Sequence, residues 1–208
     1  ALVHSRAAQL ALAPGEPVRG GDAVLALDVI APPAETAATK RFSHIADGAT
    51  LAVRAADRAR LHELHRGQLM LVRVDAQQRV LAATSVQTAG ALDALYAAAA
   101  ERAADLGATP RQRATTFKLW APTADRVELC AYDGPDSAAR ARLPLLRDEV
   151  SGIWSTGPAG APGVRSGSYY RYLVEVFVPG LGRVRNLVTD PYSVSLSADS
   201  ARSYVADL

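Results

Sequence analysis

The stretch from Phe117 to Asp133, FKLWAPTADRVELCAYD, decides how the second half of the chain folds. Two runs of strand-forming residues, FKLWA and RVELCAY, flank a PTAD segment, whose proline cannot continue a central strand. Apolar and polar residues alternate in the second run, as they do in a strand with one buried face. The segment therefore predicts two strands joined by a turn.

Four further runs with strand character follow at short intervals: RLPLL, GIWST, YYRYLVEVFV and RVRNLVT. Segments rich in Gly, Pro, Asp and Ser separate them, and no helical pattern intervenes. This order predicts an antiparallel, immunoglobulin-like β-sandwich over residues 106–190. One face of the longest run is the better candidate for the core, and it carries Tyr170, Tyr172, Val174, Val176 and Val178.

Residues 1–89 follow a different pattern, which predicts an α+β, β-rich accessory domain. Apolar runs of strand length occur at 23–30 and 50–55, and a loop rich in Pro and Ala is predicted at 31–40. Alternating runs on both sides of DAQQ, residues 75–78, predict a β-hairpin. Strong helix formers at residues 90–105 then predict a helix that joins the two domains. The fold class expected is mainly β.

Composition excludes several classes of function. The 208 residues carry a net charge of +2, and their arginines are scattered, unlike the clustered basic face of a nucleic-acid-binding protein. No apolar run approaches the ~20 residues that span a bilayer. The single cysteine, Cys130, excludes an intrachain disulfide, and its alternating flanks predict a small buried hydrophobe.

The sequence predicts no metal site and no cofactor. His62 and His65 have the spacing of neighbours on a helix, so they could offer two nitrogen ligands. Further ligands at a useful spacing are missing, and we interpret the two histidines as part of a solvated helix face.

The order of motifs in the second half resembles the sandwich that precedes the catalytic barrel in pullulanase-type α-1,6-debranching enzymes of glycoside hydrolase family 13. The motifs are FKLWAPTADRVELCAYD, DEVSGIWS, SYYRYLVEV and LVTDPYSVSLSADSARSYVADL. In those enzymes the sandwich is classed with the family 48 carbohydrate-binding modules. The earlier stretches FSHIADGATLAV and LVRVDAQQRVLAATSVQTAGALDALYAAAA are similar to the accessory domain that lies before this module in many bacterial pullulanases.

The resemblance implies a non-catalytic N-terminal region. The family's catalytic residues lie in a (β/α)8 barrel of about 250 residues, which this chain does not contain, so no catalytic residue is expected here. Asp190 belongs to a family signature, DPY, and is interpreted as a residue that organises the turn before Pro191. Residues 191–208 are expected to form a linker toward the barrel, which would be the main partner.

Binding of α-glucan is the second expectation, and three aromatic residues are its candidates. Sugar sites use exposed Trp or Tyr rings beside polar groups. Active family 48 modules commonly place one tryptophan after the second strand and one on the late hairpin. The corresponding stretches here, DGPDSAARARL and VPGLGRVRN, contain no aromatic residue. The remaining candidates for contact with glucan or with the barrel are Trp154, Tyr169 and Tyr192, although Trp154 could instead pack within its strand.

Two other interpretations stay open at this stage. The sandwich could bind α-glucan on its own, which requires at least two exposed aromatic residues on one surface. The chain could also be a free-standing β-rich interaction protein unrelated to carbohydrate. The compartment is not determined by the sequence; family members with this layout are often exported, which slightly favours a periplasmic, cell-surface or secreted protein.

Overall fold

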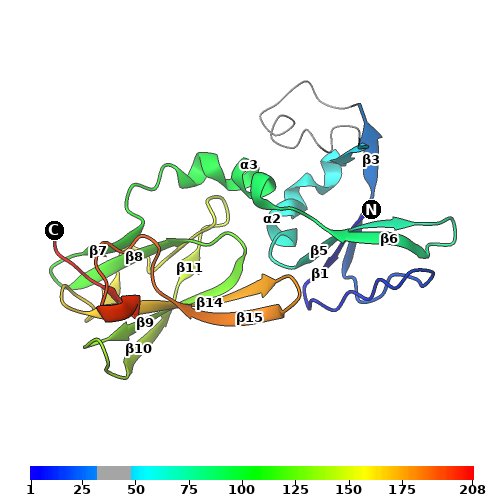
Figure 1. The fold of residues 1–208 in the computed structure, drawn as a ribbon. Helices are drawn as coiled ribbons and strands as arrows, with labels where there is room; N and C mark the ends of the chain where they lie inside the picture. The colour runs from blue at the N-terminus through cyan, green and yellow to red at the C-terminus, as the bar shows by residue number, and fades with distance from the viewer. Residues whose placement is uncertain (32–47) are drawn as a thin grey trace. The chain divides into compact units, whose positions relative to one another are not determined.

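The fold is taken from a computed structural model that describes residues 1–31 and 48–208. The chain forms two compact units, residues 1–91 and residues 92–208 (Figure 1). Nearly all of the loop predicted at residues 31–40 lies outside the described residues. Within the two described ranges, no helix is long and apolar enough to cross a membrane.

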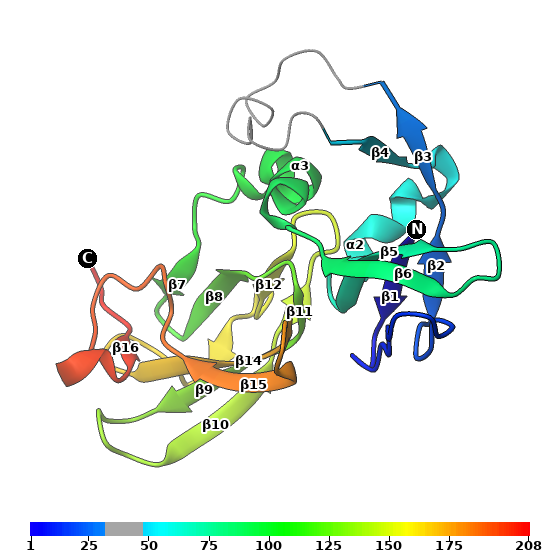
Figure 2. The same ribbon diagram turned by 45° about the vertical axis from the view of Figure 1, so that its right-hand side comes forward.

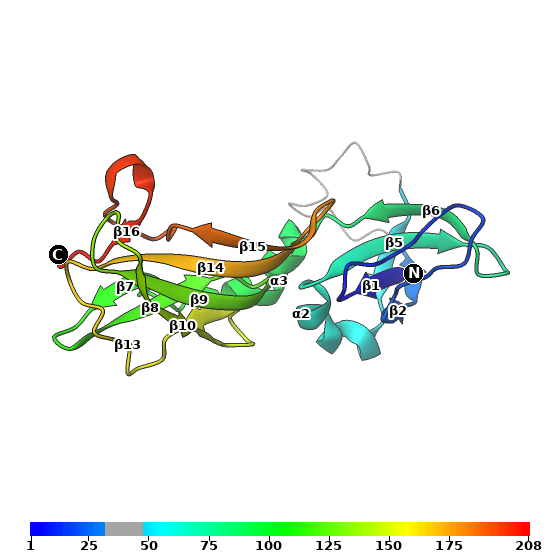
Figure 3. The ribbon, with the colours of Figure 1, turned by 90° about the horizontal axis from the view of Figure 1, so that it is seen from below.

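The first unit is built on a four-stranded antiparallel sheet with the strand order β2-β1-β5-β6 (Figure 3). Its strands are β1 (Leu2–Ser5), β2 (Ala23–Leu25), β5 (Gln68–Val74) and β6 (Val80–Ser85). The predicted hairpin is confirmed as β5–β6. Asp75 closes its turn by accepting the backbone N–H groups of Gln77 and Arg79 at 2.9 and 2.8 Å.

Short elements complete this unit. Strands β3 (Leu27–Ile30) and β4 (Thr50–Val53) form a separate two-stranded sheet, followed by the 3-10 helix η2 (Ala55–Arg60) and the helix α2 (Leu61–Leu64). The buried core of this unit includes a cluster of four leucines: Leu2, Leu25 and Leu69 on the sheet and Leu64 on α2. His65 follows α2 and corrects the prediction of a solvated face, because it is buried with Nδ1 2.6 Å from the carbonyl oxygen of Leu61.

The helix α3 (Ala89–Ala100) connects the sheet of the first unit to the sandwich of the second. It ends at Ala100, before the predicted end at residue 105, and residues 101–106 lead from it to the next strand. Lys118 binds Asp105 at 2.7 Å, and β7 (Gly107–Pro110) pairs with β8 (Ala114–Trp120).

The second unit is the predicted antiparallel sandwich, whose two sheets face each other (Figure 2). One sheet has the order β10-β9-β14-β15, with β16 also paired to β14. Its strands are β9 (Ala124–Tyr132), β10 (Ala139–Pro144), β14 (Tyr169–Val178), β15 (Gly182–Val188) and β16 (Ser203–Tyr204). The other sheet has the order β11-β12-β8-β13, with β7 beside β8, and contains β11 (Leu146–Arg147), β12 (Ile153–Ser155) and β13 (Ala161–Pro162).

The core between these sheets confirms the predicted inward face of β14 for Tyr170, Tyr172 and Val174, whereas Val176 and Val178 are half-buried and lie outside the core cluster. Tyr170 and Tyr172 are fully buried and pack with Phe117, whose ring centroid lies 4.8 Å from that of Tyr170. Burying side chains of this size contributes ~2–3 kcal/mol each to folding. Cys130 is also buried, as its flanks predict, and burial raises the pKa of its thiol.

The C-terminal segment, residues 191–208, is more closely integrated than a linker would be. After the short 3-10 helix η3 (Ala198–Ser200), β16 pairs with the start of β14, so that Ser203 lies opposite Tyr170. Val205 is fully buried in the core between the sheets. The segment therefore contributes both backbone pairing and apolar packing to the sandwich.

Candidate functional site

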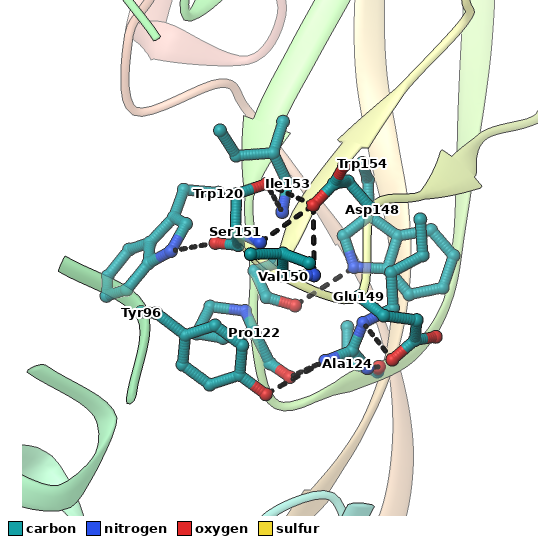
Figure 4. Close-up of polar contacts among 12 residues, drawn as sticks. Tyr96, Trp120, Pro122, Ala124, Asp148, Glu149, Val150, Ser151, Ile153 and Trp154 are labelled. Atoms are coloured by element: carbon teal, nitrogen blue, oxygen red, sulfur yellow. Dashed lines mark hydrogen bonds and ion pairs between the residues drawn. The ribbon is translucent and has the colours of Figure 1, made fainter. Parts of the chain in front are cut away.

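Trp154 lies in the core of the sandwich rather than on its surface. The residue is 6% exposed, and its indole N–H donates to the carbonyl oxygen of Ala121 at 3.0 Å (Figure 4). Both the ring and its polar atom are therefore engaged inside the unit. This placement favours packing, the competing interpretation of Trp154, over contact with a sugar.

Tyr192 lies on a turn organised by Asp190. The backbone N–H of Tyr192 donates to Asp190 Oδ1 at 2.8 Å, and the tyrosine side chain is half-buried against the core. Burial, followed by the charge of Asp190, raises the pKa of the Tyr192 phenol. The arrangement keeps this tyrosine close to Gly107, where a Cβ atom would lie 3.2 Å from Tyr192 Cβ.

Asp190 itself is buried, and its carboxylate lies next to the hydroxyl groups of two core tyrosines. Its Oδ2 accepts the hydroxyl of Tyr170 at 2.7 Å and that of Tyr172 at 3.4 Å, and its backbone N–H donates to Ser203 Oγ at 2.9 Å. Burial raises the pKa of the Asp190 carboxyl, against the opposing effect of hydrogen bonds from Tyr192 and the two phenols. This enclosed carboxyl organises the turn, as the sequence predicts, and joins β14 to the C-terminal segment.

Tyr169 occupies the opposite face of β14, and the structure places other tyrosines beside it. Strand register puts Tyr169 directly opposite Tyr132 on β9 and Tyr204 on β16. The rings of Tyr169 and Tyr204 meet edge to face, with centroids 5.1 Å apart, and both are half-buried. We call Tyr169 and Tyr204 the outer tyrosine pair.

An arginine covers the third tyrosine of this face. The guanidinium of Arg202 stacks 3.8 Å from the ring centroid of Tyr132, which is 5% exposed. The same guanidinium donates to the carbonyl oxygens of Gly134 and Ser137, at 2.5 and 2.8 Å. The loop after β9, which lacks an aromatic residue, is thus held by a cation that stacks on Tyr132.

The structure therefore does not bring the three predicted residues together. Tyr169 lies on the outer face, whereas Trp154 and Tyr192 pack against the core between the sheets. Tyr204 and Arg202 were not among the sequence candidates. Their position depends on the pairing of β16 with β14, and the alternation in SARSYVADL is the only local signal that could have indicated a strand there.

A second polar cluster in the sandwich is built around Arg147. Its side chain is 5% exposed. Nη2 donates to the hydroxyl of Tyr96 at 3.1 Å and to the carbonyl oxygen of Pro122 at 3.0 Å. Nε lies 3.4 Å from Glu149 Oε2. The planar guanidinium thereby connects α3, the turn after β8 and β11.

The neighbouring turn is closed by Asp148. Its Oδ1 accepts the N–H groups of Val150 and Ser151, at 3.0 and 2.7 Å, and the hydroxyl of Ser151 at 2.9 Å. The hydrogen bonds from Ser151 hold the pKa of Asp148 below its ordinary value. Trp120 adds to the same cluster by donating its indole N–H to the carbonyl oxygen of Ser151 at 3.0 Å (Figure 4). These contacts are structural and leave no acid or base poised for chemistry.

The described ranges contain no group of three or more His, Cys, Asp or Glu residues that could hold a metal ion. The two polar clusters of the sandwich are built around side chains that already bond to one another and to the backbone. The outer tyrosine pair is the part of this unit whose chemistry best fits an external ligand, because it offers two partly exposed rings, and Arg202 stacks on the tyrosine paired with Tyr169 in the next strand.

Comparisons with known proteins match both units. The family model of the pullulanase N2 domain matches residues 1–94, and that of carbohydrate-binding module 48, the isoamylase N-terminal domain, matches residues 105–193. A pullulanase from Klebsiella pneumoniae is 38% identical over 169 residues, which are 81% of this chain and 15% of that protein. Pullulanase 1, chloroplastic, from Arabidopsis thaliana is 34% identical over 150 residues, which are 71% of this chain and 15% of that protein.

Solved structures give the same result. The maltotriose complex of PulA from Klebsiella pneumoniae matches 99% of this chain at 33% identity with a TM-score of 0.82, and PulA from Klebsiella oxytoca matches with a TM-score of 0.78. The chain spans 21% of the first of these structures and 19% of the second. The chain thus consists of a pullulanase N2 domain followed by a carbohydrate-binding module of family 48, and it is similar to the N-terminal part of the pullulanases that it matches.

Proposed function

We propose that this chain acts as a non-catalytic N-terminal region of a debranching enzyme that hydrolyses α-1,6 bonds in pullulan, limit dextrins or starch. The observation that carries this proposal is the ordered pair of matched families, in a chain of which 81% aligns with a protein named pullulanase. We further propose that residues 1–89, the helix at 90–105 and the sandwich at 106–190 work as one docking region. The stretch at 191–208 would lead toward a catalytic barrel.

Exposed apolar side chains support a docking role for the sandwich. Val194 and Leu196 are 68% and 45% exposed, in the segment that precedes β16. Leu187 and Val188 at the end of β15 are 38% and 39% exposed. Val194 and Leu196 are two residues apart, and exposed apolar side chains that lie close together are typical of surfaces that bind another protein. A barrel packed there would remove them from water.

We expect the barrel of a pullulanase to be more stable when residues 1–208 precede it. Burial of an apolar interface should raise the Tm of the barrel by about 5 °C, because a partner that binds only the folded state stabilises it. Calorimetry of the joined protein measures this shift. The double variant Val194→Ser, Leu196→Ser should lose most of it.

Val150→Ser is the matched control, since Val150 is 69% exposed in the same unit but lies in the turn before β12. This control should leave the Tm of the barrel unchanged. An isolated barrel with the same Tm and the same kcat/KM on pullulan as the joined protein would contradict the docking role.

Weak contact with α-glucan is the second part of the proposal, and the outer tyrosine pair supports it. We expect the 208-residue chain to bind maltotriose with a Kd in the millimolar range, through the partly exposed ring of Tyr204 or Tyr169. Because loss of an aromatic contact removes about 1 kcal/mol or more, Tyr204→Ala should weaken binding by about fivefold or more, measured by calorimetry.

Tyr192→Phe serves as the control for this titration, because Tyr192 packs against the core and not beside Tyr204. It should bind maltotriose as the unchanged chain does. Equal affinity of the Tyr204→Ala and Tyr169→Ala variants and the unchanged chain would exclude the outer tyrosine pair as the contact.

A further inference from the structure

A small polar cleft in the first unit offers a binding site that neither of the two polar clusters of the sandwich accounts for. It has a volume of about 270 Å³ and lies between the end of β1, the start of β2 and the helical segment η2–α2. Four charged side chains line it, namely Arg6, Asp22, Arg60 and Glu63. Ala23 and Leu64 supply an apolar part of the wall.

The carboxylate of Asp22 is held in one orientation in this cleft. His4 Nδ1 lies 2.5 Å from Oδ1, and the backbone N–H of Arg6 donates to Oδ2 at 2.5 Å. Burial alone would raise the pKa of Asp22, but the hydrogen bonds from Arg6 and His4 outweigh it and lower the pKa. The side chain is nevertheless 46% exposed, so an ionised, fixed acceptor faces the cleft.

The histidine that orients this carboxylate is itself fixed. Its side chain is 5% exposed, and Nε2 packs against the backbone of Gly67 so closely that any Cβ at residue 67 would collide with it. A ring confined in this way cannot turn away from Asp22. The geometry of the carboxylate is therefore built into the folded unit and does not depend on a flexible surface side chain.

The cleft carries two positive and two negative side chains, and this balance favours a neutral ligand over a charged one. Two arginines and two carboxylates line the cleft. Arg6 Nη1 lies 3.8 Å from Glu63 Oε1, and Arg60 Nη1 donates to Asp57 Oδ1 at 3.1 Å. An anion would meet Asp22 and Glu63, and a cation would meet the two arginines, so neither is favoured by the net field. A neutral molecule with many hydroxyl groups can donate to the carboxylates and accept from the arginines at once.

We propose that this cleft binds one pyranose ring of a neutral saccharide. Its volume is just below the ~300 Å³ at which sites for larger ligands begin, which suits one ring and not a chain of rings. The C–H face of the ring would lie toward Ala23, at the apolar part of the wall. The choice of α-glucan as the saccharide rests on the proposed function, and a site for one ring would take the end of such a chain.

Nuclear magnetic resonance on the 208-residue chain tests this proposal. The amide of Arg6 is the reporter, because it donates to Asp22 and should shift when sugar hydroxyls engage that carboxylate. The probes are maltotriose, α-cyclodextrin, which has no chain end, and sodium acetate as a small anion. We expect a saturable shift with maltotriose alone.

Two variants of neighbouring arginines make a matched pair for this titration. Arg60 lines the cleft, whereas Arg58 is exposed on the same helical segment and does not line it. Loss of a hydrogen bond to a charged group should weaken maltotriose binding about tenfold in Arg60→Gln and leave it unchanged in Arg58→Gln.

The possible results separate this proposal from the proposed function. Maltotriose shifts confined to the amides around Tyr169 and Tyr204 would overturn the cleft as a sugar site and leave glucan contact by the sandwich intact. Shifts caused by acetate and not by maltotriose would overturn the choice of a neutral ligand. An absence of any shift at about 50 mM maltotriose, well above a millimolar Kd, would overturn both the cleft and the glucan contact.

Discussion

Replacing Asp190 by alanine should lower the free energy of unfolding of the sandwich by ~3–5 kcal/mol. The substitution removes the acceptor of two phenol hydroxyls on tyrosines that are fully buried, and it removes the cap on the backbone N–H of Tyr192. A buried donor that has lost its acceptor still carries the full cost of having been removed from water. Truncating only the acceptor therefore lowers stability more than replacing both the donor and the acceptor by apolar groups would. Urea unfolding followed by the fluorescence of Trp154 and Trp120, which both lie in this unit, measures the change.

Asp190→Asn is the informative control, because it keeps an acceptor oxygen without the buried charge. Burial raises the pKa of Asp190 in the folded state, so the folded protein holds a proton more readily than the unfolded protein. Stability contributed by this group is then present below the ordinary aspartate pKa and is lost as pH rises through the raised value. The asparagine variant should lack that dependence. An alanine variant as stable as the unchanged chain at every pH would contradict this account.

Replacing Arg147 by methionine should destabilise the same unit by ~3 kcal/mol and release α3 from the sandwich. Methionine fills much of the same volume, but it leaves the carbonyl oxygens of Pro122 and Ala124 without the guanidinium that now contacts them at 3.0 and 3.5 Å. It also removes the hydrogen bond that Arg147 Nη2 donates to the hydroxyl of Tyr96, which is fully buried on α3. Hydrogen exchange of the α3 amides should accelerate more than exchange in β9 or β14.

Two further variants show how much of this loss of stability comes from the hydrogen bond to Tyr96 and how much from the other contacts of Arg147. Tyr96→Phe removes only the hydroxyl and should cost about 1 kcal/mol, the usual value for one hydrogen bond. Arg147→Lys retains the charge but not the fork of donors, so it should fall between the unchanged chain and the methionine variant. If Arg147→Met unfolded at the same urea concentration as the unchanged chain, the guanidinium would not be what holds α3 in place.

Long, regularly alternating strands were the features that the sequence revealed best. The ten residues of β14 repeat the alternation often enough to place Tyr170 and Tyr172 inside the sandwich. The three residues of β12 are too few for the same argument, because a change of register by one residue reverses the direction of every side chain. The burial of Trp154 therefore became evident only when β12 was paired with β8.

Contacts between distant segments could not be predicted in this way. Tyr204 joins Tyr169 only because a two-residue strand near the end of the chain pairs with the start of β14. The role of Arg147 depends on carbonyl groups of a turn more than twenty residues earlier, and backbone carbonyls carry no signature in the sequence. The cleft beside Asp22 likewise needs β1, β2 and α2 to be assembled before its four charges meet.

The buried thiol of Cys130 can report opening of the sandwich. It is the only cysteine, it is 1% exposed in the middle of β9, and burial raises the pKa of its thiol, so the reactive thiolate is scarce and shielded. A thiol reagent can reach it only when β9 separates from its neighbours. The rate at which a thiol reagent alkylates Cys130 therefore reports how often the sandwich opens. The measurement uses a single site and needs no added label. Binding of a glucan or of a barrel to the folded sandwich would lower the alkylation rate of Cys130.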